Sequence, residues 1–383
     1  MEKNKIKNRI LALISLGIVV IAFVLVGQRF IFNPMDHDYV RLKGYYMEDE
    51  NTLDIVMMGS SEVFCDYSPG IAYRETGLTS YPFAFNINPS TIWKYELPEI
   101  LSTQSPQVLV VEVNGACYND ETLTDYGATR HLIDAMPFSQ NKQKIISEMS
   151  PIISDEHLTS YYLPILKYHG EVLKHDPRST ITPFLRGYNL LRGVFAHTTY
   201  VTDKYPNIKL LDVDKNKMMP LHRDAEKGLM EFLDLCKEYD IENILFVQFP
   251  HLPLSQWSKD KIERYNTVKE IVEAQGYEFL YTGDYYNDIG LVIEEDFADG
   301  EHLNANGQEK FSAWLSRFLK EKYDLKPAQL SDKQREEWEN TVKYTQGFYE
   351  YWEDYIRENP NPDDRVALTE TPYAIKRINQ LLK

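Results

Sequence analysis

Short apolar runs alternate with longer amphipathic stretches along most of the chain. Five runs have the length and composition of buried strands, and they lie at 53–58, 81–85, 108–113, 244–249 and, more weakly, 278–281. Helix-like stretches separate or follow them, at 91–101, 222–239, 258–275 and 306–323. Strands that alternate with helices need parallel crossover connections. The pattern therefore predicts an α/β fold, a three-layer sandwich with a mainly parallel central sheet.

A different pattern stands at the N-terminus, where residues 10–26 form an uncharged apolar run. Its length, about seventeen residues, is near the lower limit for a helix that crosses a bilayer. Four basic residues precede the run: Lys3, Lys5, Lys7 and Arg9. This bias predicts a single-pass cell-membrane anchor with a cytoplasmic N-terminus and an extracytoplasmic body. A cleaved signal peptide is the alternative, which we rank second because no small-residue cleavage site follows the run.

The rest of the chain divides by pattern into a main domain and additions to it. Residues 118–219 are too long for a structureless loop, and we interpret them as a helical insertion, a lid or a partner surface. The tail is rich in Glu, Lys, Tyr and Trp and is strongly helical from Asp332 to about Glu358. The expected organisation is a cytoplasmic tip and anchor at 1–30, a stalk at 31–50, the main α/β domain at 51–325 and a helical appendage at 326–383.

Composition excludes several classes of protein. With 41 basic and 58 acidic residues the net charge is −17, and no basic stripe lies beyond the N-terminus, so nucleic-acid binding is not expected. The three cysteines, Cys65, Cys117 and Cys236, are too few and too scattered for a disulfide framework or a zinc site, and we expect them to fill core space. No cluster of His, Asp and Glu has metal-ligand spacing, so we expect neither a metal nor another cofactor.

Candidate chemistry begins directly after the first predicted strand, in the sequence Gly59-Ser60-Ser61-Glu62. In an open α/β sheet the functional crevice lies at the carboxyl ends of the strands, so either serine stands where ligands bind. The glycine permits a sharp turn before it. The alternative is that one of these serines only caps the following helix.

A second motif, Asp299-Gly300-Glu301-His302, lies just before the last helix-like stretch of the main domain. A serine hydroxyl is a weak nucleophile that needs a histidine to take its proton, and the histidine needs a carboxylate to orient it. Asp299 and His302, three residues apart on one loop, can supply both groups. Asp296 is a less well placed alternative for the carboxylate.

Together the two motifs resemble the first and last sequence blocks of the SGNH (GDSL-like) hydrolase superfamily, over residues 53–323. The resemblance implies Ser61 as the nucleophile, with Ser60 in place of the usual aspartate. It also implies an oxyanion hole formed by the Ser61 amide, by Asn88 after the second strand and by Asn114 after the third, with Asn119 as the alternative to Asn114. These middle blocks fit the family pattern less well than the end blocks do.

The Gly-Ser-Ser start, the His-Leu-Asn ending and the single anchor are most similar to one extracytoplasmic branch of this superfamily. That branch includes the D-alanyl transfer protein of teichoic-acid modification and proteins that cooperate with membrane-bound O-acyltransferases. The resemblance implies a serine esterase or O-acyl transferase that acts on acylated cell-envelope carbohydrate or teichoic acid. The alternative is a non-catalytic subunit that scaffolds a membrane acyl-transfer complex.

Two further features receive structural interpretations. His251 follows the fourth strand and is expected to be structural more than substrate-binding. Aromatic residues gather in the appendage and are expected to pack it against the main domain: Tyr344, Phe348, Tyr349, Tyr351, Trp352 and Tyr355.

Overall fold

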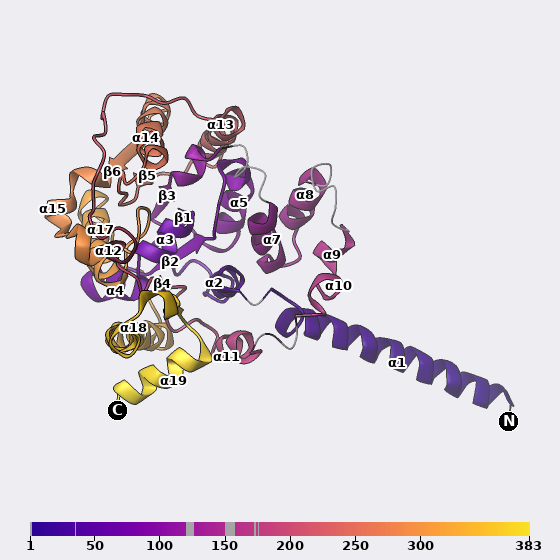
Figure 1. The fold of residues 1–383 in the computed structure, drawn as a ribbon. Helices are drawn as coiled ribbons and strands as arrows, with labels where there is room; N and C mark the ends of the chain where they lie inside the picture. The colour runs from indigo at the N-terminus through magenta and orange to yellow at the C-terminus, as the bar shows by residue number, and fades with distance from the viewer. Residues whose placement is uncertain (1, 35, 120–125, 150–157, 172–173, 175) are drawn as a thin grey trace.

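The apolar N-terminal run is part of one long helix that projects from the body of the protein (Figure 1). The structure, a computed structural model, describes residues 2–34, 36–119, 126–149, 158–171, 174 and 176–383. Helix α1 covers Glu2–Phe30, and its segment Lys5–Gln28 is long and apolar enough to cross a membrane. Its side chains are almost all exposed, which is unlike the core helix of a soluble domain.

All five predicted strands are present, with bounds shifted by at most two residues, and they form one parallel sheet. They are β1 Ile55–Gly59, β2 Ser80–Ala84, β3 Val108–Glu112, β5 Ile244–Gln248 and β6 Glu278–Tyr281. The strand order is β2-β1-β3-β5-β6, and every neighbouring pair is parallel. Because the carboxyl ends of parallel strands meet at one edge, the segments that follow β1, β2, β3 and β5 converge there.

Helices cover both faces of the sheet, as the alternation of side chains requires. In β1, Val56 and Met58 face one apolar core, while Ile55 and Met57 face the other. The first core is completed by α2 His37–Tyr45, α5 Trp93–Thr103, α13 Arg223–Glu238 and α14 Gln256–Ala274. The second is completed by α3 Ser61–Asp66, α4 Pro69–Thr76 and α17 Ala305–Lys322. The predicted three-layer arrangement is therefore present.

The segment expected to be a stalk is part of the folded body instead. Within residues 31–50, helix α2 buries Tyr39, Leu42 and Tyr45 against the sheet, all at most 2% exposed. Asp36 caps this helix by accepting a hydrogen bond from the Tyr39 amide at 2.8 Å. The body thus begins within a few residues of α1, so only a short segment connects α1 to the elements that pack on the sheet.

The insertion and the C-terminal appendage pack together beside the sheet. Described helices of the insertion are α7 Tyr126–Ala135, α8 Gln140–Met149, α9 Thr159–Tyr162, α10 Ile165–Tyr168, α11 Arg178–Arg186 and α12 Val201–Lys204. The appendage contains α18 Asp332–Glu358 and α19 Pro372–Leu381. Strand β4, Phe195–Ala196, pairs antiparallel with β7, Leu368–Thr369, and so joins the two regions.

The aromatic residues of α18 pack inward, as expected from the sequence. Phe348, Tyr351 and Trp352 are at most 3% exposed and share a core with Leu191 and Val194 of the insertion. Short helices complete the fold: η1 Ser90–Ile92, η2 Asn114–Cys117, η3 Thr282–Asp284, α15 Tyr286–Ile289, α16 Ile293–Asp296 and η4 Pro362–Asp364.

Truncation of Phe311 on α17 tests the core that supports the carboxyl edge of the sheet. Its ring is fully buried and meets the Phe249 ring edge to face, with centroids 5.0 Å apart. Phe311→Ala should lower the free energy of unfolding by about 3–5 kcal/mol, because it removes buried surface and leaves a cavity. Urea unfolding followed by tryptophan fluorescence measures this. Phe138→Ala is the control, because it removes the same atoms from a ring that is 78% exposed. A similar loss of unfolding free energy in Phe138→Ala would contradict the core position of Phe311.

Candidate active site

The turn between β1 and α3 places two serines at the carboxyl edge of the sheet. Strand β1 ends at Gly59, Ser60 is the residue before the helix, and Ser61 is the first residue of α3. Gly59 has φ +150°, and a Cβ atom there would lie 2.6 Å from the Cβ of Glu112. The turn therefore requires glycine both for its backbone conformation and for its close approach to β3.

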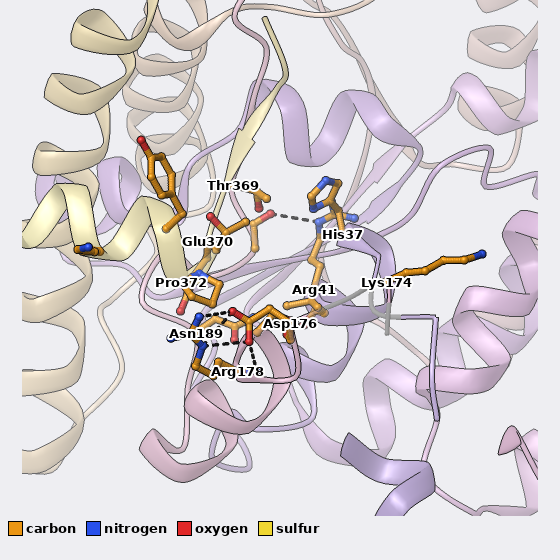
Figure 2. Close-up of a pocket in the computed structure, with 15 residues that line it drawn as sticks. His37, Arg41, Lys174, Asp176, Arg178, Asn189, Thr369, Glu370 and Pro372 are labelled. Carbon is orange, nitrogen blue, oxygen red and sulfur yellow. Dashed lines mark hydrogen bonds and ion pairs between the residues drawn. The ribbon is translucent and has the colours of Figure 1, made fainter. Parts of the chain in front are cut away.

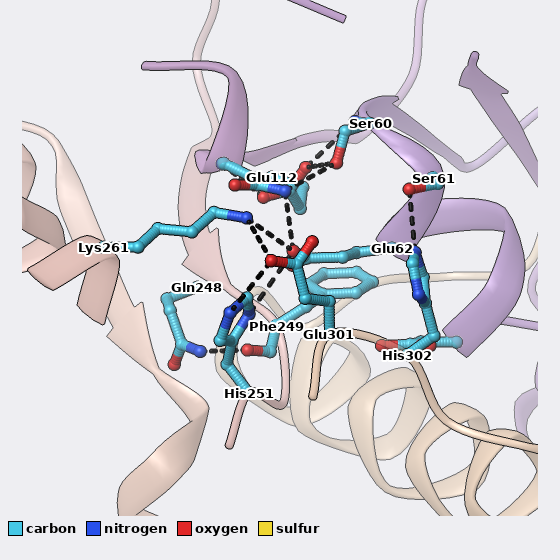
Figure 3. Close-up of polar contacts among 12 residues, drawn as sticks. Ser60, Ser61, Glu62, Glu112, Gln248, Phe249, His251, Lys261, Glu301 and His302 are labelled. Carbon is cyan, nitrogen blue, oxygen red and sulfur yellow. Dashed lines mark hydrogen bonds and ion pairs between the residues drawn. The ribbon is translucent and has the colours of Figure 1, made fainter. Parts of the chain in front are cut away.

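Ser61, His302 and Asp299 form a continuous chain of hydrogen bonds. The Oγ of Ser61 lies 2.8 Å from Nε2 of His302, and Nδ1 of His302 lies 3.1 Å from both carboxylate oxygens of Asp299. Ser60 points the other way, and its Oγ donates to Glu112 at 2.8 Å (Figure 3). The structure thus distinguishes the two serines, and it brings Ser61 together with the histidine and aspartate predicted to accompany it.

The loop that carries Asp299 and His302 is held by its own backbone. The amides of Glu301 and His302 donate to Oδ1 of Asp299, at 2.7 and 3.0 Å. The next amide, that of Leu303, donates to the buried carboxylate of Asp66 at 2.8 Å. Asp66 is the last residue of α3, so this bond ties the histidine loop to the helix that begins at Ser61.

Asp296, the alternative carboxylate, is used elsewhere. Its side chain is buried, accepts a hydrogen bond from the Val292 amide at 2.7 Å and pairs with Lys310 at 2.6 Å. Asp299 is therefore the carboxylate that faces His302.

The Asp299–His302 pair is strongly polarised. Burial alone would lower the pKa of His302, but the charge of Asp299 and its hydrogen bond outweigh burial and raise that pKa to about 9. Burial alone would raise the pKa of Asp299, but the His302 charge and hydrogen bond hold it below its ordinary value. At neutral pH the pair is thus mainly an imidazolium and a carboxylate.

A cavity of about 270 Å³ opens beside Ser61 and His302. The remaining lining residues come from several elements: Asp36, His37, Asp38, Phe64, Cys65, Asn86, His131, Phe195 and His197. His131 of α7 lies 2.8 Å from Asp36; burial alone would lower its pKa, but hydrogen bonds to Asp36 and Asp38 raise it to about 10. Sequence analysis did not identify His37, His131 and His197 as site residues, because no motif surrounds them and only the fold brings their segments to the cavity.

The predicted oxyanion asparagines do not line this cavity. The Asn88 amide nitrogen donates to the Gly59 carbonyl and to Glu96, both at 3.0 Å, and its side chain is fully buried. The Asn114 amide nitrogen donates to Glu62 at 2.7 Å. Each of these side chains is thus bound to a buried acid, and the oxyanion role expected of the two residues stays a prediction. Ser61 is the member of the predicted set that does line the cavity, together with Asn86.

Behind Ser61 lies a buried polar network (Figure 3). Glu112, at the end of β3, accepts hydrogen bonds from the Ser60 amide at 2.9 Å and from its hydroxyl. Burial raises the pKa of both Glu62 and Glu112 to about 8. Lys261 of α14 lies 3.0 Å from Glu301 and 4.0 Å from Glu62. This network fixes the start of α3 from the side opposite His302.

His251 belongs to the same buried network and does not line the cavity. Its ring nitrogens lie 3.5 Å from Glu62 and 3.7 Å from Glu301. Burial and the charge of Lys261 lower its pKa to about 3, so the ring is neutral. The structural interpretation of His251 agrees with this position.

A larger cavity, of about 620 Å³, adjoins the first through His37, which lines both (Figure 2). Its walls come from α2, the insertion and the appendage. The charged residues along it are Arg41, Lys174, Asp176, Arg178, Glu370 and Lys376. Basic side chains outnumber acidic ones here, although the whole chain carries a net charge of −17.

One group of soft donor atoms meets at the first cavity. A nitrogen of His197, a nitrogen of His302 and the Sγ of Cys65 all lie within 4.8 Å of one another. Sequence spacing predicted no metal cluster. Spacing could not identify this group, because its three residues are far apart in the chain. All three cysteines are buried and unbridged, as expected of core residues.

No model of a known protein family matches the chain, and no curated protein matches it significantly. What this site can do is therefore argued from its geometry.

The raised pKa of His302 predicts an alkaline activity profile. Only the neutral imidazole can accept the Ser61 proton, so reaction with a fluorophosphonate should be slow at pH 7 and rise with a midpoint near pH 9. In Asp299→Asn the midpoint should fall toward ~6.5, the ordinary histidine value, while the maximal rate drops about 10²–10⁴-fold. Labelling rates measured from pH 5 to 10 with a chelator present test this, and a flat profile would contradict it.

Proposed function

We propose that the protein is an extracytoplasmic serine esterase or O-acyl transferase of the SGNH type. One observation carries this proposal: Ser61, His302 and Asp299 are linked at 2.8 and 3.1 Å beside an open cavity. A hydroxyl, a base within hydrogen-bond distance and a carboxylate that orients the base are the parts that acyl transfer through serine needs.

In the proposed reaction the Ser61 oxygen attacks the acyl carbonyl of an ester while its proton passes to Nε2 of His302. His302 then gives that proton to the departing alcohol, and the acyl group remains as an ester on Ser61. Water or an acceptor hydroxyl next loses its proton to His302 and takes the acyl group, and Ser61 regains its proton. Asp299 keeps Nδ1 protonated and offsets the imidazolium charge.

For the oxyanion we assign the Ser61 amide and, in place of Asn88 and Asn114, Asn86. Asn86 is exposed, lines the cavity with Ser61, and lies two residues after the end of β2. The backbone amide of Asn86 already donates to Asp38 at 3.0 Å, so its side chain is the donor we assign. Removal of a single such donor typically lowers turnover about 10²–10³-fold.

The substrate class we propose is an acylated cell-envelope carbohydrate or teichoic acid. The two cavities that meet at His37 offer room for an extended chain, and the basic residues along the larger one suit phosphate or carboxylate groups (Figure 2). A membrane-bound O-acyltransferase is the partner that such an anchored domain would serve.

A non-catalytic scaffolding subunit is the second candidate. It is favoured by the buried positions of Asn88 and Asn114, which leave the expected oxyanion hole incomplete. The following experiment separates the two candidates.

Ser61→Ala should abolish labelling of the full-length protein by a fluorophosphonate probe, because the probe traps an activated serine oxygen. His302→Ala should reduce labelling at least about 10²-fold by removing the general base. In-gel fluorescence of the purified protein in detergent measures both effects.

Ser60→Ala is the matched control, since it removes the adjacent hydroxyl, which donates to Glu112 instead of His302. Equal labelling of wild type and Ser61→Ala would exclude the proposed nucleophile. A folded wild type that never labels at pH 9 would favour the scaffolding subunit.

The proposed topology makes a separate prediction about accessibility. The native cysteines are buried, so single introduced cysteines report on each side of the membrane. Asp363→Cys, in the exposed η4 segment, should react with an impermeant maleimide in intact cells, whereas Lys5→Cys should react only after permeabilisation. The reverse pattern would contradict the topology, and a shortened protein released from membranes would indicate a cleaved signal peptide.

A further inference from the structure

The donor atoms of Cys65, His197 and His302 converge on one point of the cavity wall. Sγ of Cys65 lies 3.5 Å from Nε2 of His197, and the two imidazole rings lie with centroids 4.9 Å apart. All three residues line the 270 Å³ cavity. An ion that enters the cavity can therefore reach all three donors.

Thiolate and imidazole are the ligands that Zn²⁺ prefers, and three protein ligands with an open fourth position are a common zinc arrangement. Zn–S bonds of about 2.3 Å and Zn–N bonds of about 2.0–2.1 Å at tetrahedral angles place S and N about 3.5 Å apart. The Cys65–His197 separation matches that value. The other donor separations in the group are at most 4.8 Å, and any that exceed about 3.5 Å would have to shorten when the ion binds.

The backbones that carry these donors are fixed to one another. Gln308 of α17 donates to the carbonyl of Cys65 at 2.7 Å and to that of Phe195 at 3.0 Å. The Trp352 indole donates to the His197 carbonyl at 2.8 Å. Outer hydrogen bonds of this kind hold metal ligands in place and reduce the ordering that binding requires.

We propose that Cys65, His197 and His302 bind one Zn²⁺ ion and that this binding reversibly silences Ser61. The thiol of Cys65 and Nε2 of the His302 imidazolium each lose a proton to solvent as the Zn–S and Zn–N bonds form, and no electron is transferred. Asp299 keeps a proton on Nδ1 of His302, so the metal takes the Nε2 lone pair. That lone pair is the one that accepts the Ser61 proton, and it cannot do both. The silencing rests on the proposed function, whereas the metal site does not.

Cobalt substitution tests the site without reference to activity. Full-length protein in detergent, freed of metal by a chelator, is titrated with Co²⁺. One equivalent should produce a thiolate-to-cobalt charge-transfer band in the near ultraviolet, and Zn²⁺ should abolish it. Cys65→Ser should remove the band, and His197→Gln should weaken Co²⁺ binding at least about 10-fold. Cys117→Ser, which alters another buried cysteine, and Ser61→Ala should both leave the band intact.

No charge-transfer band in the wild type, or a band unchanged in Cys65→Ser, would overturn the site. Fluorophosphonate labelling tests the silencing: wild-type labelling should fall as Zn²⁺ is added and recover with chelator, and labelling of Cys65→Ser should resist Zn²⁺. Labelling that Zn²⁺ leaves unchanged while the cobalt band forms would overturn the silencing. A wild type that forms the band and never labels would reject the proposed function and leave the metal site standing.

Discussion

The hydrogen bond from the Leu303 amide to the buried Asp66 carboxylate holds the two halves of the candidate site together. Ser61 and Asp66 are the first and last residues of α3, and His302 directly precedes Leu303. Ser61 and His302 come from segments 241 residues apart, yet this 2.8 Å bond fixes one end of α3 to the histidine loop. Asp66 is fully buried, and burial raises its pKa well above the ordinary value. Burying this carboxyl group costs free energy, and in return its bond to Leu303 fixes the position of His302.

Two further sets of hydrogen bonds fix the two ends of α3. Glu112 at the end of β3 accepts hydrogen bonds from the amide and hydroxyl of Ser60, so the turn before Ser61 is fixed to the sheet. Gln308 of α17 donates a hydrogen bond to the Cys65 carbonyl, so the last turn of α3 is fixed to α17, the helix after the histidine loop. A chain of 2.8 and 3.1 Å contacts requires little reorganisation when its parts are fixed in this way.

The sequence predicted the sheet and its main helices because each leaves a local signal. The Ser61, Asp299 and His302 set was predicted because two motifs that are weak alone together resemble the first and last blocks of a known family. Strands leave apolar runs, and Ser61 and His302 stand at the junctions of strands or loops with helices. Sequence analysis was less successful for features that depend on contacts between distant segments. Residues 31–50 mix polar and aromatic positions, and only the sheet surface makes Tyr39, Leu42 and Tyr45 a buried face. Asparagines after strands were expected to face the cavity, but the acids they bind come from other elements, which no local pattern reveals.

Burial also separates the acids near Ser61 into two kinds. The proposed acyl transfer would develop negative charge on an acyl oxygen, and an ionised carboxylate behind α3 would oppose it. Burial raises the pKa of Glu62 and Glu112 to about 8, so near neutral pH these side chains are mainly uncharged and still accept hydrogen bonds from Asn114 and Ser60. Burial opposes ionisation of Asp299 and Glu301 as well, but His302 and Lys261 outweigh burial and hold the pKa values of these two acids below the ordinary ones. The fold thus keeps charge on two acids that face a cation and suppresses it on Glu62 and Glu112 behind α3.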